Sequence, residues 1–295
     1  MRIDQVLLEA VARLARHASG EAATPHLDAQ LLMAHALGRS RTWLYTWGDR
    51  EIEGAELERF NDLVERREKG EPVAWLLGYR EFFGLRLAVS PYTLIPRPDT
   101  ETLVEQALQR MPVTGGGRAL DLGTGSGAIA LALAFERPDW HITGIDIVPE
   151  AIMLARRNAE TLDITNVCFE ESDFFSALDP SARFELIVSN PPYIDELDEH
   201  LGQGDVRFEP RSALVAKDHG MADLLHLIDT ARTFLTPEGW LLLEHGFQQG
   251  EPVRAALVDA GYQCVGTCRD LGGRERISLG QWPMASSELL KGAGS

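Results

Sequence analysis

The residues best suited to chemistry lie in one stretch, Phe184–Ile194, which reads F-E-L-I-V-S-N-P-P-Y-I. Its apolar first half is typical of a strand that is covered on both faces. Two consecutive prolines lack a backbone N–H, so the strand must end before them. The residues that follow, Asn190–Tyr193, present one amide side chain, free carbonyls and a flat aromatic ring. Because this acceptor tip offers many hydrogen-bond acceptors and few donors, it predicts a substrate that carries an –NH2 group.

A glycine loop, D-L-G-T-G-S-G, follows another predicted strand and precedes a predicted helix. Glycine lets the backbone approach a ligand closely, and a strand–loop–helix context is the one that a nucleotide site needs. The dinucleotide fingerprint G-x-G-x-x-G is incomplete, because the position that should hold its last glycine is Ala128. Asp121 is expected to hold the loop backbone or to bind a cationic ligand group. Cofactor contacts are expected from Gly123, Thr124, Gly125, Ser126 and Gly127.

Acidic and aromatic residues end two further predicted strands. Asp146 lies about twenty residues after the glycine loop, where a carboxylate can accept hydrogen bonds from both hydroxyls of a ribose. Asp173 and Phe174 follow the third strand, where they could pair with the amine of an adenine and stack on its ring. These features predict a nucleoside cofactor. The alternatives are a tight turn without a ligand for the loop, and a place in the core for Phe174 and Phe175.

From Arg118 onward, predicted strands and helices alternate, which indicates an α/β fold with a mostly parallel sheet and helices on both faces. Two last strands around Gly272 and Gly273 predict an antiparallel hairpin at the sheet edge. Open parallel sheets bind ligands beyond the carboxyl ends of their strands. We therefore expect the glycine loop, Asp146, Asp173 and the acceptor tip to share one pocket.

The chain before this α/β region divides into two predicted parts. Short amphipathic segments predict a helical bundle over residues 1–79, which has no catalytic constellation and is a candidate for partner recognition. Residues 80–98 predict a β-hairpin and a proline-stiffened linker. The catalytic domain is expected over 99–285, with Asp99 or Thr100 capping its first helix. A disordered tail is expected over 286–295.

Composition limits the possible partners. The net charge is −17, which disfavours direct binding to the phosphates of nucleic acids. The three cysteines form no C-x-x-C pair and have no paired histidine ligands, so we expect reduced thiols and no metal site. No apolar run approaches the ~18 residues of a membrane helix, and the amphipathic N-terminus carries acids, unlike a signal peptide. A cytoplasmic monomer without a membrane partner is expected.

The motifs together resemble a family. D-L-G-T-G-S-G, Asp146 and N-P-P-Y are similar to class I methyltransferases that use S-adenosyl-L-methionine to modify a planar amino or amide nitrogen. Three segments, V-S-P-Y-T-L-I-P-R-P-D-T-E (89–101), S-D-F-F-S-A-L (172–178) and V-S-N-P-P-Y-I (188–194), resemble the PrmC/HemK protein-(glutamine-N5) methyltransferases, as do the N-terminal helices. That resemblance extends to about Gln281. The family often carries tryptophan at the position of Phe174, whose ring still stacks but lacks the indole N–H.

The resemblance implies a reaction and its site. The substrate would be the glutamine of the G-G-Q loop in class I peptide chain release factors, and the cofactor product would be S-adenosyl-L-homocysteine. The glycine loop, Asp146, Phe174 and Asn190 would contact the methyl donor. Asn190, Pro191, Pro192 and Tyr193 would hold the glutamine amide. We expect Asn190 and Pro191 each to accept one N–H of that amide, and Tyr193 to pack against its plane.

Other functions compete with this one. An adenine-N6 nucleic-acid methyltransferase shares the N-P-P-Y motif, but the charge of −17 and the lack of a basic recognition segment disfavour it. A non-catalytic protein that binds S-adenosylmethionine and a partner would have no use for the acceptor tip. An NAD-dependent oxidoreductase is disfavoured by the incomplete glycine fingerprint.

Overall fold

The computed structural model describes residues 1–17 and 24–284, and the chain divides into two compact units. Unit 1 comprises Met1–Arg80 together with Asp198–Glu209, and unit 2 comprises Glu81–Leu197 together with the chain from Pro210 onward. The tail predicted over 286–295 lies outside the described residues. Within the described ranges, no helix is long and apolar enough to cross a membrane.

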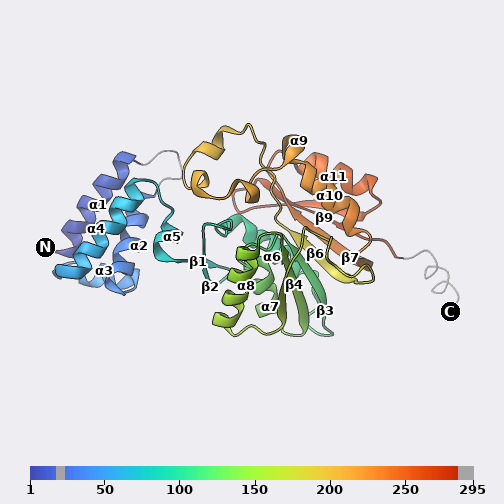
Figure 1. The fold of residues 1–295 in the computed structure, drawn as a ribbon, viewed down its shortest axis with the longest axis horizontal. Coiled ribbons are helices and arrows are strands. Elements are labelled where there is room, and N and C mark those ends of the chain that lie inside the picture. Colours follow the sequence, from blue (N-terminus) through green and yellow to red (C-terminus); the bar gives the residue numbers. More distant parts are fainter. Residues whose placement is uncertain (18–23, 285–295) are drawn as a thin grey trace. The chain divides into compact units, whose positions relative to one another are not determined.

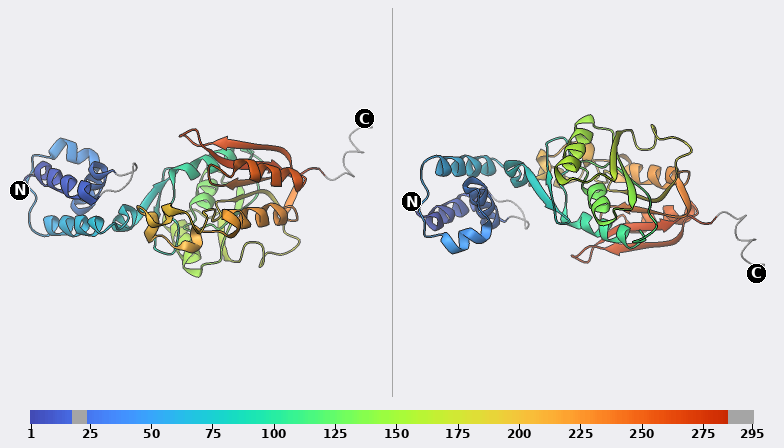
Figure 2. Two further views of the ribbon diagram at one scale, coloured as in Figure 1. Left: turned by 90° about the horizontal axis from the view of Figure 1, so that it is seen from above. Right: turned by 90° about the horizontal axis from the view of Figure 1, so that it is seen from below.

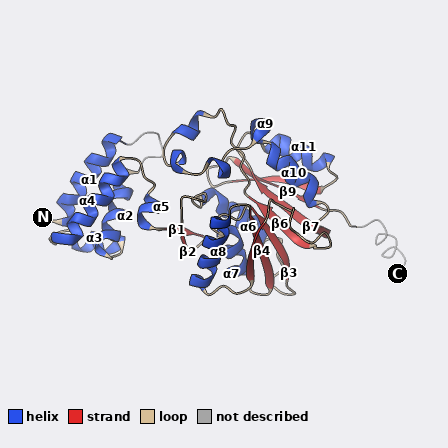
Figure 3. Ribbon diagram, viewed as in Figure 1, coloured by secondary structure: helices blue, strands red, loops and turns tan. Residues whose placement is uncertain are grey.

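Unit 1 is helical over its first part (Figure 3). Its helices are α1 (Ile3–His17), α2 (Pro25–Leu37), α3 (Arg41–Trp47), α4 (Gly54–Glu68) and α5 (Val73–Leu77). Helix α1 has apolar residues three or four positions apart, so its buried face packs on α2 and α4. The core of this unit is formed by these buried apolar faces, which is how a small helical bundle is stabilised.

A segment from a distant part of the sequence completes unit 1. Asp198–Glu209 lies against the helical part, where Asp205 Oδ1 accepts a hydrogen bond of 2.7 Å from Arg67 Nη1. The Arg67 side chain also contacts a carboxylate of α2, so this half-buried guanidinium joins two acids. The ring of Phe208 meets the ring of Trp75 edge-on at 6.4 Å. The sequence pattern did not predict this association.

Unit 2 contains a sheet of seven strands in the order β5-β4-β3-β6-β7-β9-β8 (Figure 1). The strands are β3 (Gly117–Leu122), β4 (Trp140–Asp146), β5 (Val167–Glu171), β6 (Phe184–Ser189), β7 (Leu235–Glu244), β8 (Gln263–Arg269) and β9 (Glu275–Gln281). Strands β3 to β7 pair in parallel, whereas β9 pairs antiparallel with β7 and β8. The β8–β9 hairpin, red in Figure 2, forms one edge. The predicted α/β fold and antiparallel edge are confirmed.

Helices cover both faces of this sheet (Figure 1). They are α6 (Glu101–Leu108), α7 (Ala128–Glu136), α8 (Pro149–Leu162), α10 (Ala222–Ala231) and α11 (Gly250–Asp259). The four-residue segment α9 (Lys217–Gly220), in which Asp218 and His219 have left-handed φ angles, precedes α10. Successive strand side chains point to opposite faces, so Ala119 belongs to the apolar cluster under α6, α7 and α8, and Leu120 to the one under α10 and α11. Both faces are therefore buried, as the continuous apolar strands predict.

The remaining elements are short. They are the two-stranded sheet of β1 (Tyr79–Phe82) and β2 (Leu85–Ala88), and the 3-10 turns η1 (Pro98–Thr100), η2 (Glu199–Gly202), η3 (Val206–Phe208) and η4 (Arg211–Ala213). Among them, η2 and η3 belong to the Asp198–Glu209 segment of unit 1. Strand β7 begins at Leu235, which pairs with Phe184 ahead of an irregularity in the register. The predicted cap of α6 by Asp99 or Thr100 is wrong, since both residues belong to η1, which runs directly into α6, and the start of α6 has no side-chain capping hydrogen bond.

Candidate active site

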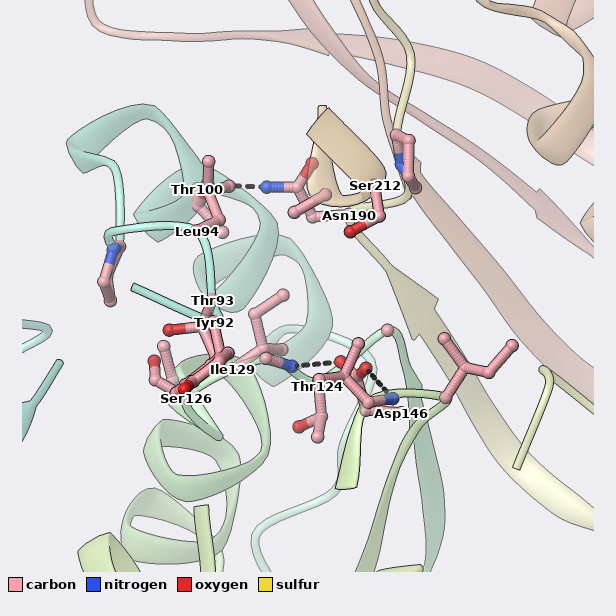
Figure 4. A pocket seen from close by; sticks show the side chains of 18 of the residues that line it. Tyr92, Thr93, Leu94, Thr100, Thr124, Ser126, Ile129, Asp146, Asn190 and Ser212 are labelled. Carbon is pink, nitrogen blue, oxygen red and sulfur yellow. Dashed lines mark hydrogen bonds between the residues drawn. The ribbon is translucent and has the colours of Figure 1, made fainter. Parts of the chain in front are cut away.

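A cavity of about 300 Å³ lies in unit 2, beyond the carboxyl ends of β3, β4, β5 and β6 (Figure 4). Most of the residues predicted for the site share its wall, although they come from four separate strand ends. They are Gly123, Thr124, Gly125, Ser126, Asp146, Asp173, Phe174, Asn190 and Pro192. The topology therefore brings the glycine loop and the acceptor tip to one space.

Four predicted residues do not line the cavity: Asp121, Gly127, Pro191 and Tyr193. Asp121 lies fully buried beneath the glycine loop, where its Oδ2 accepts hydrogen bonds from Thr124 Oγ1 at 2.6 Å and from a backbone N–H of α7 at 3.2 Å. Burial raises the pKa of Asp121 to about 7. Of the two roles expected for this residue, the geometry matches the one that holds the loop.

The three glycines of the loop have left-handed φ angles, which are +72° at Gly123, +55° at Gly125 and +83° at Gly127. A Cβ at Gly127 would approach three neighbouring side chains to 3.1 Å, so this residue allows α7 to pack closely. A Cβ at Gly123 would meet no atom within 4 Å. The first two glycines thus keep the cavity wall open, whereas the third serves the packing behind it.

Asp146 connects two turns at the end of β4. Its Oδ2 accepts a hydrogen bond of 2.9 Å from the N–H of Gly125, and its Oδ1 accepts one of 2.9 Å from the N–H of Val148. Burial raises the pKa of Asp146, and the backbone hydrogen bonds oppose that shift. Each carboxylate oxygen keeps a further lone pair, so the side chain can accept from a ligand hydroxyl as well.

The two phenylalanines after β5 have different surroundings. Phe175 is buried and stacks on Phe234 with ring centroids 4.9 Å apart, so it belongs to the core. Phe174 lines the cavity with a left-handed φ of +43°, and Ser172 Oγ donates a hydrogen bond of 2.8 Å to its carbonyl. An unfavourable backbone conformation that neighbours hold in place is common at ligand sites.

The acceptor tip is oriented by side chains that lie behind it. Asn190 Nδ2 donates a hydrogen bond of 3.2 Å to Thr100 Oγ1, as Figure 4 shows. The Tyr193 hydroxyl donates to Glu244 Oε1 at 3.3 Å, and the Tyr193 carbonyl accepts from Gln249 Nε2 at 3.0 Å. Among the described residues, no group donates a hydrogen bond to Asn190 Oδ1. The oxygen of this amide therefore stays available to a ligand.

Several wall residues were missed as site residues in the sequence. One group, Tyr92, Thr93, Leu94, Pro96 and Arg97, comes from the segment predicted as a linker, and Thr100 comes from the predicted helix start that follows it. A second group, Ser212, Ala213 and Asp223, follows the acceptor tip in the chain. The motif I-P-R-P-D-T-E was the available signal for the first group. No motif in the sequence marked the second group, because these residues reach the cavity only through the tertiary fold.

Comparisons with known proteins cover both units. Residues 5–78 match the PrmC N-terminal domain, and residues 114–260 match a methyltransferase domain. A methyltransferase from Pyrococcus furiosus of known structure shares the fold, with a TM-score of 0.53 and 19% identity, covering 76% of this chain and 100% of that one.

Curated relatives are much closer in sequence. The release factor glutamine methyltransferase of Salmonella typhimurium is 57% identical over 259 residues, which are 88% of this chain and 93% of that protein. The Escherichia coli protein of the same name is 53% identical over 282 residues, which are 96% of this chain and 99% of that protein. The chain therefore belongs to the PrmC/HemK family of release factor glutamine methyltransferases.

Proposed function

We propose that this chain transfers a methyl group from S-adenosyl-L-methionine to the side-chain amide nitrogen of the glutamine in the G-G-Q loop of class I peptide chain release factors. The observation that carries the proposal is that Asn190 and the glycine loop line the same cavity. One wall is suited to a nucleoside and the other to an –NH2 group. Family membership supports the choice of a glutamine amide over a base.

The wall residues fit S-adenosylmethionine in chemical type. Gly123 and Gly125 leave room beside the loop, Asp146 keeps lone pairs for ribose hydroxyls, and Phe174 offers an aromatic face for an adenine. Asp173, also in the wall, can accept from the adenine amine. When bound, the cofactor supplies an electrophilic methyl group on a sulfonium. Thr124 and Ser126 complete the assigned cofactor wall.

The acceptor tip would act on a poor nucleophile. An amide nitrogen is weakly nucleophilic because its lone pair is delocalised into the carbonyl. In our proposal Asn190 Oδ1 accepts one N–H, and the carbonyl of Pro191, which stands between the wall residues Asn190 and Pro192 in the chain, accepts the other. These two contacts hold the nitrogen in line with the methyl group. The same acceptors stabilise the positive charge that develops on nitrogen as the new N–C bond forms and the bond between the methyl group and the donor sulfur breaks. The nitrogen then loses a proton to water, so no strong general base is needed.

Pro192 and Tyr193 support this site in different ways. Pro192 forms part of the wall beside Asn190 and limits the space around the amide. The Tyr193 ring packs with the apolar cluster under α10 and α11, and its hydroxyl contacts Glu244. We therefore assign Tyr193 to the support of the tip, in place of the packing against the substrate amide that the sequence predicts.

A transfer assay tests the substrate. The enzyme is incubated with methyl-labelled S-adenosylmethionine and a class I release factor, DNA or no acceptor. We expect label only in the release factor, and loss of that label when the G-G-Q glutamine is replaced by alanine. Label in DNA would support the adenine-N6 alternative. Absence of label in every arm, despite cofactor binding, would support a non-catalytic role and contradict the proposal.

A further inference from the structure

The acceptor tip is held at its two ends. On one side, Ser189 is the last residue of β6 and pairs with both neighbouring strands. Pro191 and Pro192 have no N–H, and among the described residues no group donates a hydrogen bond to their carbonyls. On the other side, the carbonyl of Tyr193 accepts a hydrogen bond from a side chain. The path of the tip therefore depends on what holds Tyr193.

The side-chain amide of Gln249, the residue directly before α11, holds this carbonyl. Its Nε2 donates to the carbonyl oxygens of Tyr193 at 3.0 Å and His219 at 3.3 Å. Its Oε1 accepts a hydrogen bond of 2.8 Å from the N–H of Gly246, in the turn after β7. A carbonyl can only accept and an N–H can only donate, so the amide has one satisfied orientation. A single side chain thus joins the tip to two other segments.

The peptide group between Tyr193 and Ile194 is held at both of its polar atoms. Its oxygen accepts from Gln249, and its N–H, which belongs to Ile194, donates to the carbonyl of Leu214 at 2.9 Å. A peptide group is planar, so two hydrogen bonds on opposite sides fix the orientation of the plane. Without Gln249, the plane would be held at one side only.

The segment Asp218–Gly220 closes on the same carbonyl. Its three residues have successive left-handed φ angles of +53°, +55° and +81°. A Cβ at Gly220 would clash with the carbonyl oxygen of Tyr193 and would approach Gln249 Nε2 to 2.8 Å. An unfavourable backbone conformation persists only where its surroundings hold it. The fold therefore keeps strained backbone in place directly against Tyr193.

We propose that Gln249 is a positioning residue, which fixes the Tyr193 peptide group and thereby the direction in which the tip presents its acceptors to the substrate amide. This inference rests on the proposed function. Proline fixes φ at two successive positions, so the tip is a short, stiff link and a rotation at Tyr193 also turns the carbonyl of Pro191. Gln249 does not line the cavity, so it would act through the tip and would not touch the cofactor.

The first test exchanges the donor for an acceptor. Gln249→Glu keeps an oxygen for the N–H of Gly246, but its carboxylate has no hydrogen to give to the Tyr193 carbonyl. We expect kcat for release factor methylation to fall about tenfold at about pH 8, the effect of losing one oriented hydrogen bond. The calorimetric Kd for S-adenosylhomocysteine should change by less than about twofold. Gln248→Glu adds the same charge to the neighbouring exposed glutamine and is the matched control.

A pH profile of Gln249→Glu separates positioning from a general loss of structure. Two carbonyls face the new carboxyl, which favours its protonated form, and that form regains an O–H for Tyr193. The kcat of this variant relative to wild type should therefore rise as the pH is lowered from about 8 to about 6. A ratio that stays constant or falls would overturn the inference. The ratio removes the effect of charged and titratable groups that both enzymes share on the surrounding segments, namely Asp195, His219, His245, Glu251, Arg254 and Glu275.

The second test displaces the same carbonyl from the other side. Gly220→Ala places a methyl group against the Tyr193 oxygen, and we expect it to lower kcat about tenfold. Gly273→Ala is the matched control, because Gly273 has a similar φ of +77° but open space around its Cβ. If both changes act through Tyr193, the double variant Gln249→Glu/Gly220→Ala should lose less than the product of the two single losses.

The outcomes distinguish this inference from the proposed function. Multiplicative losses in the double variant, a Gln249→Glu enzyme as fast as Gln248→Glu, or an equal loss of affinity for S-adenosylhomocysteine would overturn the inference. Labelling of the release factor by the wild-type enzyme would then leave the proposed function intact. An unlabelled release factor with the wild-type enzyme would overturn both.

Discussion

The two sides of the cavity are held in place by different kinds of contact. On the glycine loop, the carboxylates of Asp121 and Asp146 accept hydrogen bonds from backbone N–H groups, so the main chain itself is fixed. The acceptor tip contains Pro191 and Pro192, which have no N–H to give to a carboxylate. Its orientation therefore depends on side chains, chiefly the contact of Asn190 with Thr100. A site rich in acceptors is harder to fix through its backbone than a site rich in donors.

The largest effect should come from the tip. Asn190→Ala removes the exposed acceptor, and we expect kcat to fall by at least ~10²-fold, the scale of losing one preorganised polar contact. Because the glycine loop, Asp146 and Phe174 keep their places in the cofactor wall, the Kd for S-adenosylhomocysteine should change far less than kcat. Single-turnover assays and calorimetry measure the two quantities.

Asn190→Asp sharpens that test. This variant keeps an acceptor oxygen but adds charge, so it should retain more activity than Asn190→Ala. Near-wild-type turnover of Asn190→Ala would contradict the assignment of the tip as the amide site.

A change on the loop side should show the opposite pattern. In Asp146→Asn, an amide NH2 would face the N–H of Gly125 or of Val148, so we expect the Kd for S-adenosylhomocysteine to rise about ten- to a hundredfold. The KM for the release factor should remain unchanged. Asp179→Asn is a matched control, because Asp179 Oδ1 also accepts from an N–H two residues later but lies outside the cavity wall. An equal loss of affinity for S-adenosylhomocysteine in both variants would indicate a general loss of structure and would contradict a specific role for Asp146.

The buried carboxyl of Glu244 is expected to make the stability of the fold depend on pH. Burial raises the pKa of Glu244 from its ordinary 4.5 to about 7, with Asp99 adding to this shift, while Thr100, Arg276 and Tyr193 oppose it. The folded protein therefore holds this proton more tightly than the unfolded chain does, so the contribution of Glu244 to stability falls as pH rises from about 4.5 to 7.

Glu244→Gln should then stabilise the fold at pH 8 by about 1–3 kcal/mol relative to the wild type, and by little at pH 5. Urea unfolding at the two pH values measures this difference. Glu275→Gln is the control, because Arg254 holds the pKa of Glu275 below its ordinary value and removal of that charge brings no such gain. A Glu244→Gln enzyme less stable than wild type at pH 8 would contradict this account of the buried carboxyl.

The smallest effect is expected at the aromatic wall. Phe174→Ala removes a face on which an adenine can stack, which should raise the Kd for S-adenosylhomocysteine about two- to tenfold. Phe174→Trp should restore binding, because the larger ring keeps the stacking face. Phe174 also packs against the apolar cluster under α10 and α11. An unchanged Kd in the alanine variant would mean that this packing is its main role and that it does not bind the adenine.

The sequence predicts the loop side of the site better than the tip side. Alternating apolar strands and helices indicate the parallel sheet, and a parallel sheet gathers strand ends such as Asp146 and Asn190 on one edge. Thr100 shows where this reasoning stops. Its neighbours look like a helix start, and nothing local reveals that its hydroxyl serves a residue ninety positions away.

Other site residues depend on tertiary structure in the same way. Ser212 and Asp223 come from segments with no motif of their own, and reach the cavity only because the chain returns after the acceptor tip. Glu244 reads as an ordinary acid after an apolar strand, W-L-L-L-E. Its importance depends on complete burial, which is a property of the assembled sheet.

The segment Asp198–Glu209 has a consequence for any attempt to dissect this protein. Its Asp205 pairs with Arg67 inside unit 1, so the boundary between the units is crossed by the chain more than once. A fragment beginning at Glu81 would carry Asp205 and Phe208 without the guanidinium and the indole that they contact. A fragment ending at Arg80 would leave Arg67 with one of its two acids. A single proteolytic cut therefore cannot release either half with its full set of contacts.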